Sequence, residues 1–225
     1  MKPTVHPIKL GFSNAYLVTG EKPILVDTGS PGEGGKILTA LGDHGVTPAD
    51  LALILHTHVH SDHVGSTAEL LKHADVPTAY HTADETLMQQ GSNGTLTGIG
   101  LRGRVMSTFF SNSTFERFAP SFHLTGGMRL DEYGVAATVQ HTPGHTPGSV
   151  SLLLDNGDAI VGDVWMGGFM GGSLLAERPN YHYFAEDRGQ LENSMGKLLA
   201  EKPRTFYVGH GGPLGADRVR RRFGA

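Results

Sequence analysis

The sequence predicts an α/β protein in which two β-sheets pack together and helices lie outside them. Three observations support this class. Short apolar runs typical of strands alternate with segments of helical pattern, each half of the chain shows strands followed by helices, and no linker divides the 225 residues. Because this length suffices for one sizeable core, we expect residues 1–225 to form a single domain.

The first half of the chain predicts strands at residues 15–19 and 24–27, joined by the turn Gly20-Glu21-Lys22-Pro23. The next residues, Ser30-Pro31-Gly32-Glu33, have the spacing of a capping box and predict a helix that ends near Gly45. The apolar run at 51–55 is short enough for a buried strand. We then expect a helix at about 66–74, a strand at 78–80 and a helix at about 83–90.

Residues 91–127 contain glycines, serines and phenylalanines without clear periodicity, and predict a long excursion with one helix that covers a site. Strand patterns return at 135–140, 149–154 and 159–161, with residues 155–158 as a hairpin turn between the last two. A helix at about 187–200 and a strand at 205–208 follow. The basic C-terminal sequence RVRRRFGA is expected to fray as a solvated end.

Composition excludes several classes of function. The formal net charge of −4 argues against nucleic-acid binding, and no apolar run approaches the roughly 18 residues that span a membrane. The N-terminal residues lack the apolar core of a secretory signal, so we expect a cytoplasmic protein, although a secreted protein after removal of its signal would look the same. The chain has no cysteine, so any metal must bind to nitrogen and oxygen.

The strongest motif is His58-x-His60-x-Asp62-His63, directly after the predicted strand at 51–55. Residues two apart in an extended segment point to the same side, so His58 and His60 can bind one ion. The following turn lets Asp62 and His63 face a second position. Imidazole and carboxylate groups suit zinc.

Three further residues of the ligand type stand at predicted loops or strand ends. His145 lies in the rigid turn Thr142–Gly148, while Asp163 and His210 each follow a short apolar strand. Each alone would more often be structural, but together with the first motif they supply enough ligands for two metals. Asp27 and His58 in the first half echo Asp163 and His210 in the second, which suggests an internal duplication.

With these motifs the chain resembles the metallo-β-lactamase-fold hydrolase superfamily. The matching pieces are residues 26–29, 58–63, 142–148, 162–163 and 209–213, in the order usual for the superfamily. The resemblance implies a four-layer αββα sandwich of the metallo-β-lactamase type, with two mixed sheets and helices outside. It also implies that His58, His60 and His145 hold a first metal, that Asp62, His63 and His210 hold a second, and that Asp163 bridges them.

The implied cofactor is two Zn²⁺ ions per chain, with iron or manganese as alternatives. The implied function is hydrolysis of an ester, thioester, lactone or related acyl bond in a small-molecule substrate through a metal-bridging hydroxide. Asp62 would orient the nucleophile and pass a proton to the leaving group. Asp27 would brace a ligand histidine or the motif loop without touching the metals. His56 and His141 are expected to be neighbours of the site and not ligands.

The resemblance is greatest to the glyoxalase II and acyl-homoserine lactonase types. His60 argues against flavodiiron proteins, which usually have Glu there. Three alternatives stay open. One is a mononuclear iron oxidoreductase of the persulfide dioxygenase type that uses His58, His145 and Asp163; the others are a cysteine-free β-lactamase and a binding protein that keeps its metals without turnover.

Specificity is expected from two loops, residues 91–127 and 165–184. Arg178 is expected at the surface, and the sequence leaves open whether the chain forms a homodimer. The second loop contains the aromatic residues Trp165, Phe169, Tyr181, Tyr183 and Phe184, most of which are expected to pack and some to contact substrate.

Overall fold

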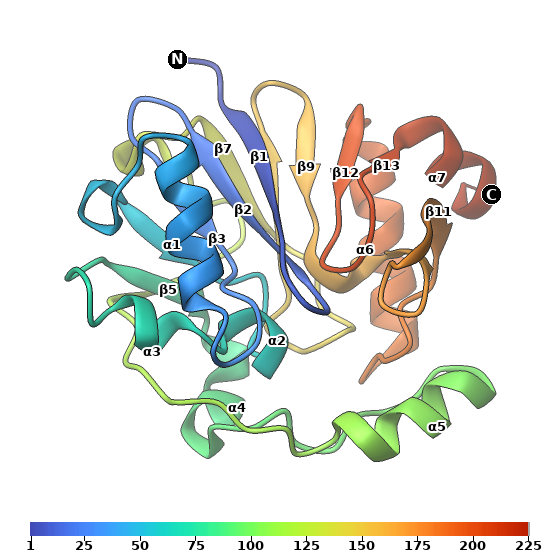
Figure 1. Cartoon of the computed structure of the whole chain (residues 1–225). Coiled ribbons are helices and arrows are strands. Elements are labelled where there is room, and N and C mark those ends of the chain that lie inside the picture. Colours follow the sequence, from blue (N-terminus) through green and yellow to red (C-terminus); the bar gives the residue numbers. More distant parts are fainter. Residues whose placement is uncertain (225) are drawn as a thin grey trace.

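Two mixed β-sheets form the centre of the protein in the computed structural model, which describes residues 1–224 (Figure 1). The strands of the first sheet run in the order β1-β2-β3-β4-β5-β6, and those of the second in the order β13-β12-β9-β8-β7. Strands β3 to β6 are parallel neighbours, as are β9 and β12, and the other pairs in both sheets are antiparallel. A small antiparallel sheet joins β10 and β11.

The strands have the following bounds: β1 Thr4–Lys9, β2 Asn14–Thr19, β3 Ile24–Val26, β4 Leu53–Leu55, β5 Thr78–His81, β6 Phe122–Leu124, β7 Ala137–His141, β8 Val150–Leu154, β9 Asp158–Ile160, β10 Met166–Phe169, β11 Leu174–Asn180, β12 Thr205–Tyr207 and β13 Leu214–Gly215. The helices are α1 Gly34–Asp43, α2 Ser61–Val64, α3 Thr67–Leu70, α4 Glu85–Gln90, α5 Gly100–Phe110, α6 Arg188–Ala200 and α7 Ala216–Phe223. No helix among the described residues has both the length and the apolar character needed to cross a membrane.

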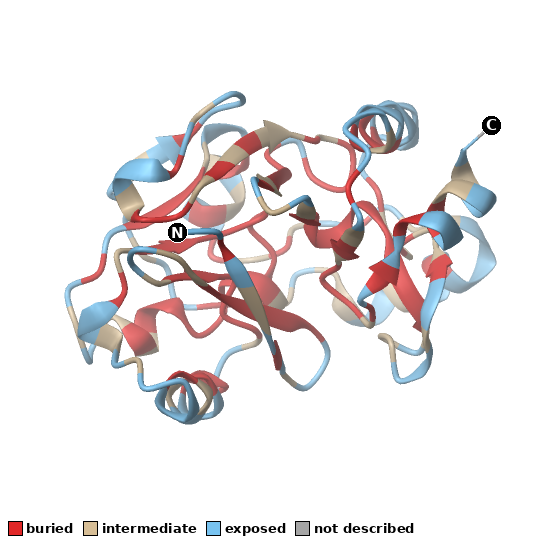
Figure 2. Cartoon of the chain, turned by 90° about the horizontal axis from the view of Figure 1, so that it is seen from above, coloured by how far each residue is buried: buried red, intermediate tan, exposed pale blue. Residues whose placement is uncertain are grey.

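Side chains alternate between the two faces of each central strand, and this alternation builds the layers. In β2, Tyr16 and Val18 enter the core between the sheets, whereas Leu17 packs outward beneath α1. Helices α6 and α7 cover the outer face of the second sheet through a separate apolar cluster that includes Phe206 and Val219. Figure 2 shows the buried strands at the centre and the exposed residues on the helices and outer loops. The predicted four-layer αββα arrangement is confirmed.

Several predicted elements were wrong in detail. The helix expected from Ser30 begins only at Gly34, because the Glu33 carboxylate accepts backbone N–H groups of Gly11 and Ser30 and holds these residues in a turn. The helix expected at 66–74 shortens to α3. Strands β1, β6, β10, β11 and β13 were not predicted, because they lie in polar or glycine-containing segments whose pairing depends on distant residues.

The C-terminal prediction was also wrong. Residues 216–223 form α7 and do not fray, since Val219 is fully buried and the Phe223 ring lies 6.2 Å from that of Trp165. Arg218, Arg221 and Arg222 of this helix are exposed. The excursion at 91–127 does contain one helix, α5, which lies at the rim of the molecule in Figure 1.

Candidate metal centre

The ligand-type side chains meet at one edge of the two sheets because they follow the ends of paired parallel strands. Val26 pairs with Leu55 across β3 and β4, which places Asp27 beside the start of the motif loop. Ile160 pairs with Tyr207 across β9 and β12. Asp163 and His210 follow these two strand ends at the same distance along the chain. The structure therefore brings the two halves of the motif set together at a single place.

The first cluster that could hold a metal consists of His58, His60 and His145, whose ligand atoms lie within 4.8 Å of one another. His145 Nε2 is 3.0 Å from His60 Nδ1. All three side chains are buried, and His145 comes from the turn between β7 and β8.

The second cluster consists of Asp62, His63 and His210. Asp62 Oδ2 lies 3.4 Å from His210 Nε2 and 3.9 Å from His63 Nε2. Both histidines are buried, while 28% of the Asp62 side chain is exposed. This partial exposure leaves Asp62 in contact with both the cluster and the cavity in front of it.

Asp163 lies between the two clusters. Its Oδ2 atom is 3.8 Å from His58 Nε2 and 3.4 Å from His145 Nε2 on one side. On the other side it is 3.5 Å from His63 Nε2 and 3.2 Å from His210 Nε2. Two ligands at about 2.1 Å from a tetrahedral metal are roughly 3.4 Å apart, so these separations are those expected between ligand atoms of a metal ion.

Unsatisfied buried atoms in this region also fit a metal. Within the described residues, His58 Nε2, His63 Nε2 and Asp163 Oδ1 are buried and have no hydrogen-bond partner. Buried polar groups are nearly always satisfied in folded proteins. The donor set of imidazole and carboxylate without thiolate suits zinc, iron or manganese. The His/Asp clusters therefore fit a metal site.

The partners of the Nδ1 atoms direct the Nε2 lone pairs of four histidines toward this centre. His63 Nδ1 donates to Asp27 Oδ2 at 2.8 Å, His145 Nδ1 to the Phe184 carbonyl at 2.9 Å, and His210 Nδ1 to the Phe12 carbonyl at 2.6 Å. His58 Nδ1 lies 3.1 Å from Thr57 Oγ1, whose hydroxyl donates to Asp27. Since each Nδ1 faces an acceptor, the neutral ring leaves Nε2 unprotonated, as a metal ligand requires.

Electrostatics divide the histidines into two groups. Burial lowers the pKa of His58, His60 and His145, so these rings are neutral. Burial also acts on His63 and His210, but the neighbouring carboxylates, led by Asp163, outweigh it. They raise the pKa of His63 well above its ordinary value and that of His210 to about 9.

Asp163 shows the complementary effect. Burial alone would raise its pKa, but the surrounding imidazoles of His182, His210 and His63 hold it well below its ordinary value. Asp163 is therefore a carboxylate in a ring of imidazoles. Divalent ions would replace the protons that balance its charge.

His182 is a ligand-type residue of the site that the sequence did not predict. Its Nε2 atom lies 3.2 Å from Asp163 Oδ2, and with His145 and Asp163 it forms a further cluster of ligand-type atoms. Burial lowers its pKa well below the ordinary value for histidine. His182 stands in the irregular segment between β11 and α6, and only its presence in the aromatic sequence Tyr181-His182-Tyr183-Phe184 could have drawn attention to it.

Two buried carboxylates brace the ligand loops. Asp27 accepts the backbone N–H and the hydroxyl of Thr57, both at 2.8 Å, in addition to His63. Asp84 accepts the backbone N–H groups of Val59 at 3.0 Å and Gly148 at 2.7 Å, and so joins the loop of His58 and His60 to the turn of His145. It also accepts the Thr146 hydroxyl at 2.8 Å.

A third carboxylate, Glu33, fixes the wall next to the clusters. It accepts N–H groups of Gly11 at 2.6 Å, Ser30 at 2.9 Å and the Lys36 ammonium at 2.9 Å. Burial would raise its pKa, but these hydrogen bonds hold it below the ordinary value.

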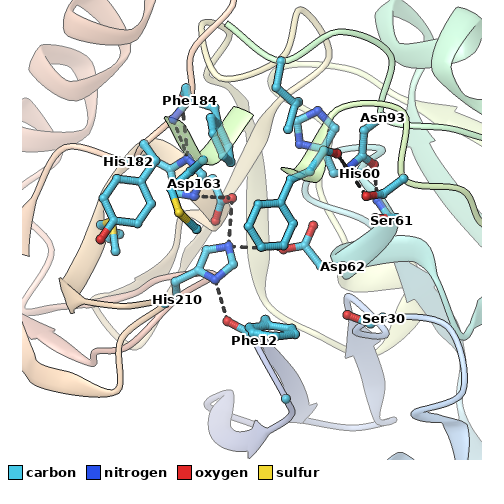
Figure 3. A pocket seen from close by; sticks show the side chains of 18 of the residues that line it. Phe12, Ser30, His60, Ser61, Asp62, Asn93, Asp163, His182, Phe184 and His210 are labelled. Atoms are coloured by element: carbon cyan, nitrogen blue, oxygen red, sulfur yellow. Dashed lines mark hydrogen bonds and ion pairs between the residues drawn. The ribbon is translucent and has the colours of Figure 1, made fainter. Parts of the chain in front are cut away.

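A cavity of about 650 Å³ opens onto the two clusters (Figure 3). Asp62, Asp163, His60, His182 and His210 form its polar floor. Its walls are mainly apolar, and no lysine or arginine of the described residues lines it. The apolar lining comes from three separate segments and includes Phe12, Leu96, Met106, Phe110, Met166, Met170, Tyr183 and Phe184.

The aromatic residues and Arg178 singled out in the sequence lie partly in the cavity and partly outside it. Of the five aromatic residues expected in the second loop, Tyr183 and Phe184 line the cavity. Trp165 is fully buried against Phe206, and Tyr181 packs on Phe223. Phe169 lies 5.3 Å from the guanidinium of Arg178, which is exposed as predicted.

Neither His56 nor His141 enters a cluster that could hold a metal. His56 is buried and lies 3.1 Å from the Thr67 hydroxyl. His141 stacks on the ring of His81 at 4.1 Å.

This fold and these His/Asp clusters are those of a metallo-hydrolase-like protein. The family model of the metallo-beta-lactamase superfamily matches residues 8–210, so the chain belongs to that superfamily. A probable metallo-hydrolase of Bacillus subtilis, YflN, is 27% identical over 233 residues, which cover 96% of this chain and 87% of YflN. The uncharacterized protein YobT of the same organism is 31% identical over 221 residues, or 93% of this chain and 85% of YobT.

Solved structures agree on the fold. TTHA1623, solved in a di-iron-bound form, is 31% identical with a TM-score of 0.68 and covers 96% of this chain and 97% of its own. BJP-1, a subclass B3 metallo-beta-lactamase of Bradyrhizobium japonicum, has a TM-score of 0.66 at 21% identity, with 93% of this chain and 78% of its own covered. At that identity BJP-1 supports the fold alone. The relatives together identify a metallo-hydrolase-like protein with a His/Asp metal-binding cluster.

Proposed function

We propose that the chain is a dinuclear metal-dependent hydrolase that cleaves an ester, thioester, lactone or related acyl bond. The observation that supports this most strongly is the position of Asp163 Oδ2, within 3.2–3.8 Å of ligand nitrogens from both clusters. His58, His60 and His145 would hold the first metal. Asp62, His63 and His210 would hold the second, and Asp163 would bridge the two.

Two divalent ions at this place would supply Lewis-acid polarisation of a carbonyl group and an activated water. The chain supplies the rest. Asp62 is the only partly exposed member of the seven, so its carboxylate can receive a proton from the attacking water and deliver it to the leaving group. The apolar walls exclude bulk water and strengthen the electrostatic interactions at the floor.

The cavity favours an uncharged substrate. Recognition of a carboxylate or phosphate normally uses Arg or Lys, and none lines the described cavity. The apolar walls instead fit an acyl chain or ring. We therefore propose small uncharged esters, thioesters and lactones as substrates, ahead of β-lactams or glutathione conjugates, which bear carboxylates.

Zinc is the proposed metal because the ligands are those of a hydrolytic zinc site without thiolate. Iron is the second candidate. It is favoured by one specific observation, the di-iron-bound form of a protein that is 31% identical over nearly the full chain. An iron-loaded protein could also be the oxidoreductase of the persulfide dioxygenase type named above. Oxygen uptake with a persulfide substrate would support that function in place of hydrolysis.

The test combines metal content with a substrate panel. After zinc loading and removal of free metal, the protein should retain two ions per chain and hydrolyse uncharged esters or lactones in a metal-dependent way. Asp62→Ala should lose about 10²–10⁴-fold in kcat, the usual contribution of an acid–base group, while remaining folded. Asp75→Ala, an exposed aspartate away from the cavity, serves as the control. Less than one ion per chain, or full activity of Asp62→Ala, would refute the proposal.

A further inference from the structure

The geometry points to His182 as a catalytic residue that donates its Nε2–H to the acyl oxygen of the substrate and does not bind metal. This inference rests on the proposed function, because it needs an acyl substrate at the metal centre. His182 is 5% exposed and lies in the polar floor of the cavity (Figure 3). The two clusters already supply the proposed dinuclear centre with six ligands around Asp163, which are His58, His60, His145, Asp62, His63 and His210.

His182 is as close to the centre as any proposed ligand. Its Nε2 is 3.2 Å from Asp163 Oδ2, the same distance as His210 Nε2. Its ring centroid lies 4.5 Å from that of His145 and 5.1 Å from that of His210. Distance alone would therefore make His182 an eighth ligand.

The Nδ1 partner of His182 distinguishes it from four of the five histidines proposed as ligands. The backbone N–H of Phe184 donates to His182 Nδ1 at 3.2 Å. The opposite direction, from Nδ1 to the Phe184 carbonyl, would span 3.4 Å, and that carbonyl already accepts His145 Nδ1 at 2.9 Å. His182 Nδ1 is thus an acceptor, and the hydrogen of the neutral ring lies on Nε2.

This arrangement is the reverse of that in His58, His63, His145 and His210, whose Nδ1 atoms face acceptors. A ring that bears hydrogen on Nε2 cannot offer that atom to a metal. It can donate a hydrogen bond. Within the described part of the chain, His182 Nε2 is near Asp163 but has no hydrogen bond of standard geometry, so its N–H remains available to a molecule in the cavity.

The donor has a defined use in acyl transfer. When the oxygen of water adds to the carbonyl carbon, the C=O electron pair moves onto the acyl oxygen. A fixed N–H at the edge of the metal centre stabilises this negative charge more than it stabilises the neutral carbonyl, and so lowers the barrier. His182 keeps its proton throughout, and Asp62 transfers the proton of the attacking water.

The first experiment separates a donor from a ligand by substitution. His182→Leu removes the N–H at similar volume, His182→Gln retains an N–H at a similar reach, and His145→Leu removes a proposed ligand. We expect His182→Leu to keep two zinc ions and lose about 10²–10³-fold in kcat with little change in KM, the loss typical of one oxyanion donor. His182→Gln should recover most of this loss, whereas His145→Leu should lose metal.

The second experiment reads the His182 ring directly and needs no turnover. In protein labelled with ¹⁵N and loaded with ¹¹³Cd, the His182 ring should be protonated at Nε2 and show no coupling to cadmium, whereas the His145 and His210 rings should show it. Coupling to His182, or loss of an ion in His182→Leu, would overturn the inference while leaving a hydrolase in place. Equal kcat for wild type and His182→Leu would overturn it too. Absence of any metal-dependent hydrolysis by the wild type would instead refute the proposed function.

Discussion

Substitution of Asp27 by asparagine gives a defined test of how the centre is supported. Asp27 has a left-handed backbone with φ of 61°, a conformation that Asn tolerates better than other non-glycine residues. Asp27→Asn therefore keeps shape and backbone and changes the hydrogen bonding alone. In the wild type, Asp27 Oδ2 accepts hydrogen bonds from His63 Nδ1 and the Thr57 hydroxyl, at 2.8 Å each, while Oδ1 accepts the Thr57 backbone N–H.

An amide cannot accept all three of these donors. If its oxygen stays with the Thr57 N–H, its NH₂ group faces His63 Nδ1, and the favoured response is transfer of the His63 hydrogen to Nε2. That tautomer cannot bind a metal. Loss of such a supporting partner typically lowers metal affinity about 10–100-fold, which corresponds to about 1.4–2.7 kcal/mol. The loss should fall on the ion held by Asp62, His63 and His210.

Zinc titration against a competing chelator measures both affinities. We expect Asp27→Asn to weaken one of the two ions by this factor and to leave the other within about threefold, whereas wild type and the control Asp50→Asn show two tight sites. Asp50 is a suitable control because its carboxylate caps only an exposed turn at Thr47. Two unchanged affinities in Asp27→Asn would show that Asp27 does not determine the ring orientation of His63.

Three further predictions follow from the contacts around the centre. Glu33→Gln should lower the unfolding free energy by about 1–3 kcal/mol at pH 7. Because folding lowers the pKa of Glu33, the stabilisation by its carboxylate is present above the unfolded-state pKa of about 4.5 and is lost as the pH falls through the folded-state pKa. The melting temperatures of wild type and Glu33→Gln should therefore converge in acid. If the difference in Tm instead grows below pH 4, the pKa assignment is wrong. Asp84→Asn leaves an amide among three donors, so it should lower the unfolding free energy measured with denaturant by about 1.5–3 kcal/mol and weaken zinc binding. If stability and zinc affinity both stay at the wild-type level, the two ligand loops are positioned independently. Gly209→Ala places a Cβ 2.0 Å from Asp163 Oδ1 and should abolish tight binding of at least one metal ion. The control Gly42→Ala, whose added Cβ meets nothing within 4 Å, should bind metal normally and gain up to about 1 kcal/mol of stability in helix α1. Normal metal content in Gly209→Ala would contradict the packing around Asp163.

The central layers could be predicted from the sequence because their strands are short apolar runs that end in sharp turns. Residues 51–55 and 205–208 gave strands close to β4 and β12. The edges of the sheets were less predictable. β1 contains Pro7 and has Ile8 as its one buried residue, and β13 has only two residues, so both strands depend on partners far along the chain.

The C-terminal helix shows a different limit. Its arginines dominate the local composition and suggested a solvated end. Val219 and Phe223 lie on one face of the helix, and only the neighbouring Trp165 and Phe206 give that face something to cover. Tertiary burial thus decides the structure of a segment whose polar character predicts disorder.

In the site, the seven predicted residues all reach one edge of the sheets because each follows a strand or a tight turn. His182 does not. It stands in an irregular segment whose path is set by backbone hydrogen bonds, such as that from Ile99 to the Tyr183 carbonyl at 2.7 Å, and no spacing rule indicates where such a ring points. The Nδ1 partners that separate donors from ligands depend likewise on contacts between distant segments.

Anomalous diffraction from crystals of the zinc-loaded protein would locate the bound ions. We expect two zinc peaks about 3.5–4 Å apart, one surrounded by His58, His60 and His145 and the other by Asp62, His63 and His210, with Asp163 in contact with both. A single peak, or two peaks that Asp163 does not join, would contradict it.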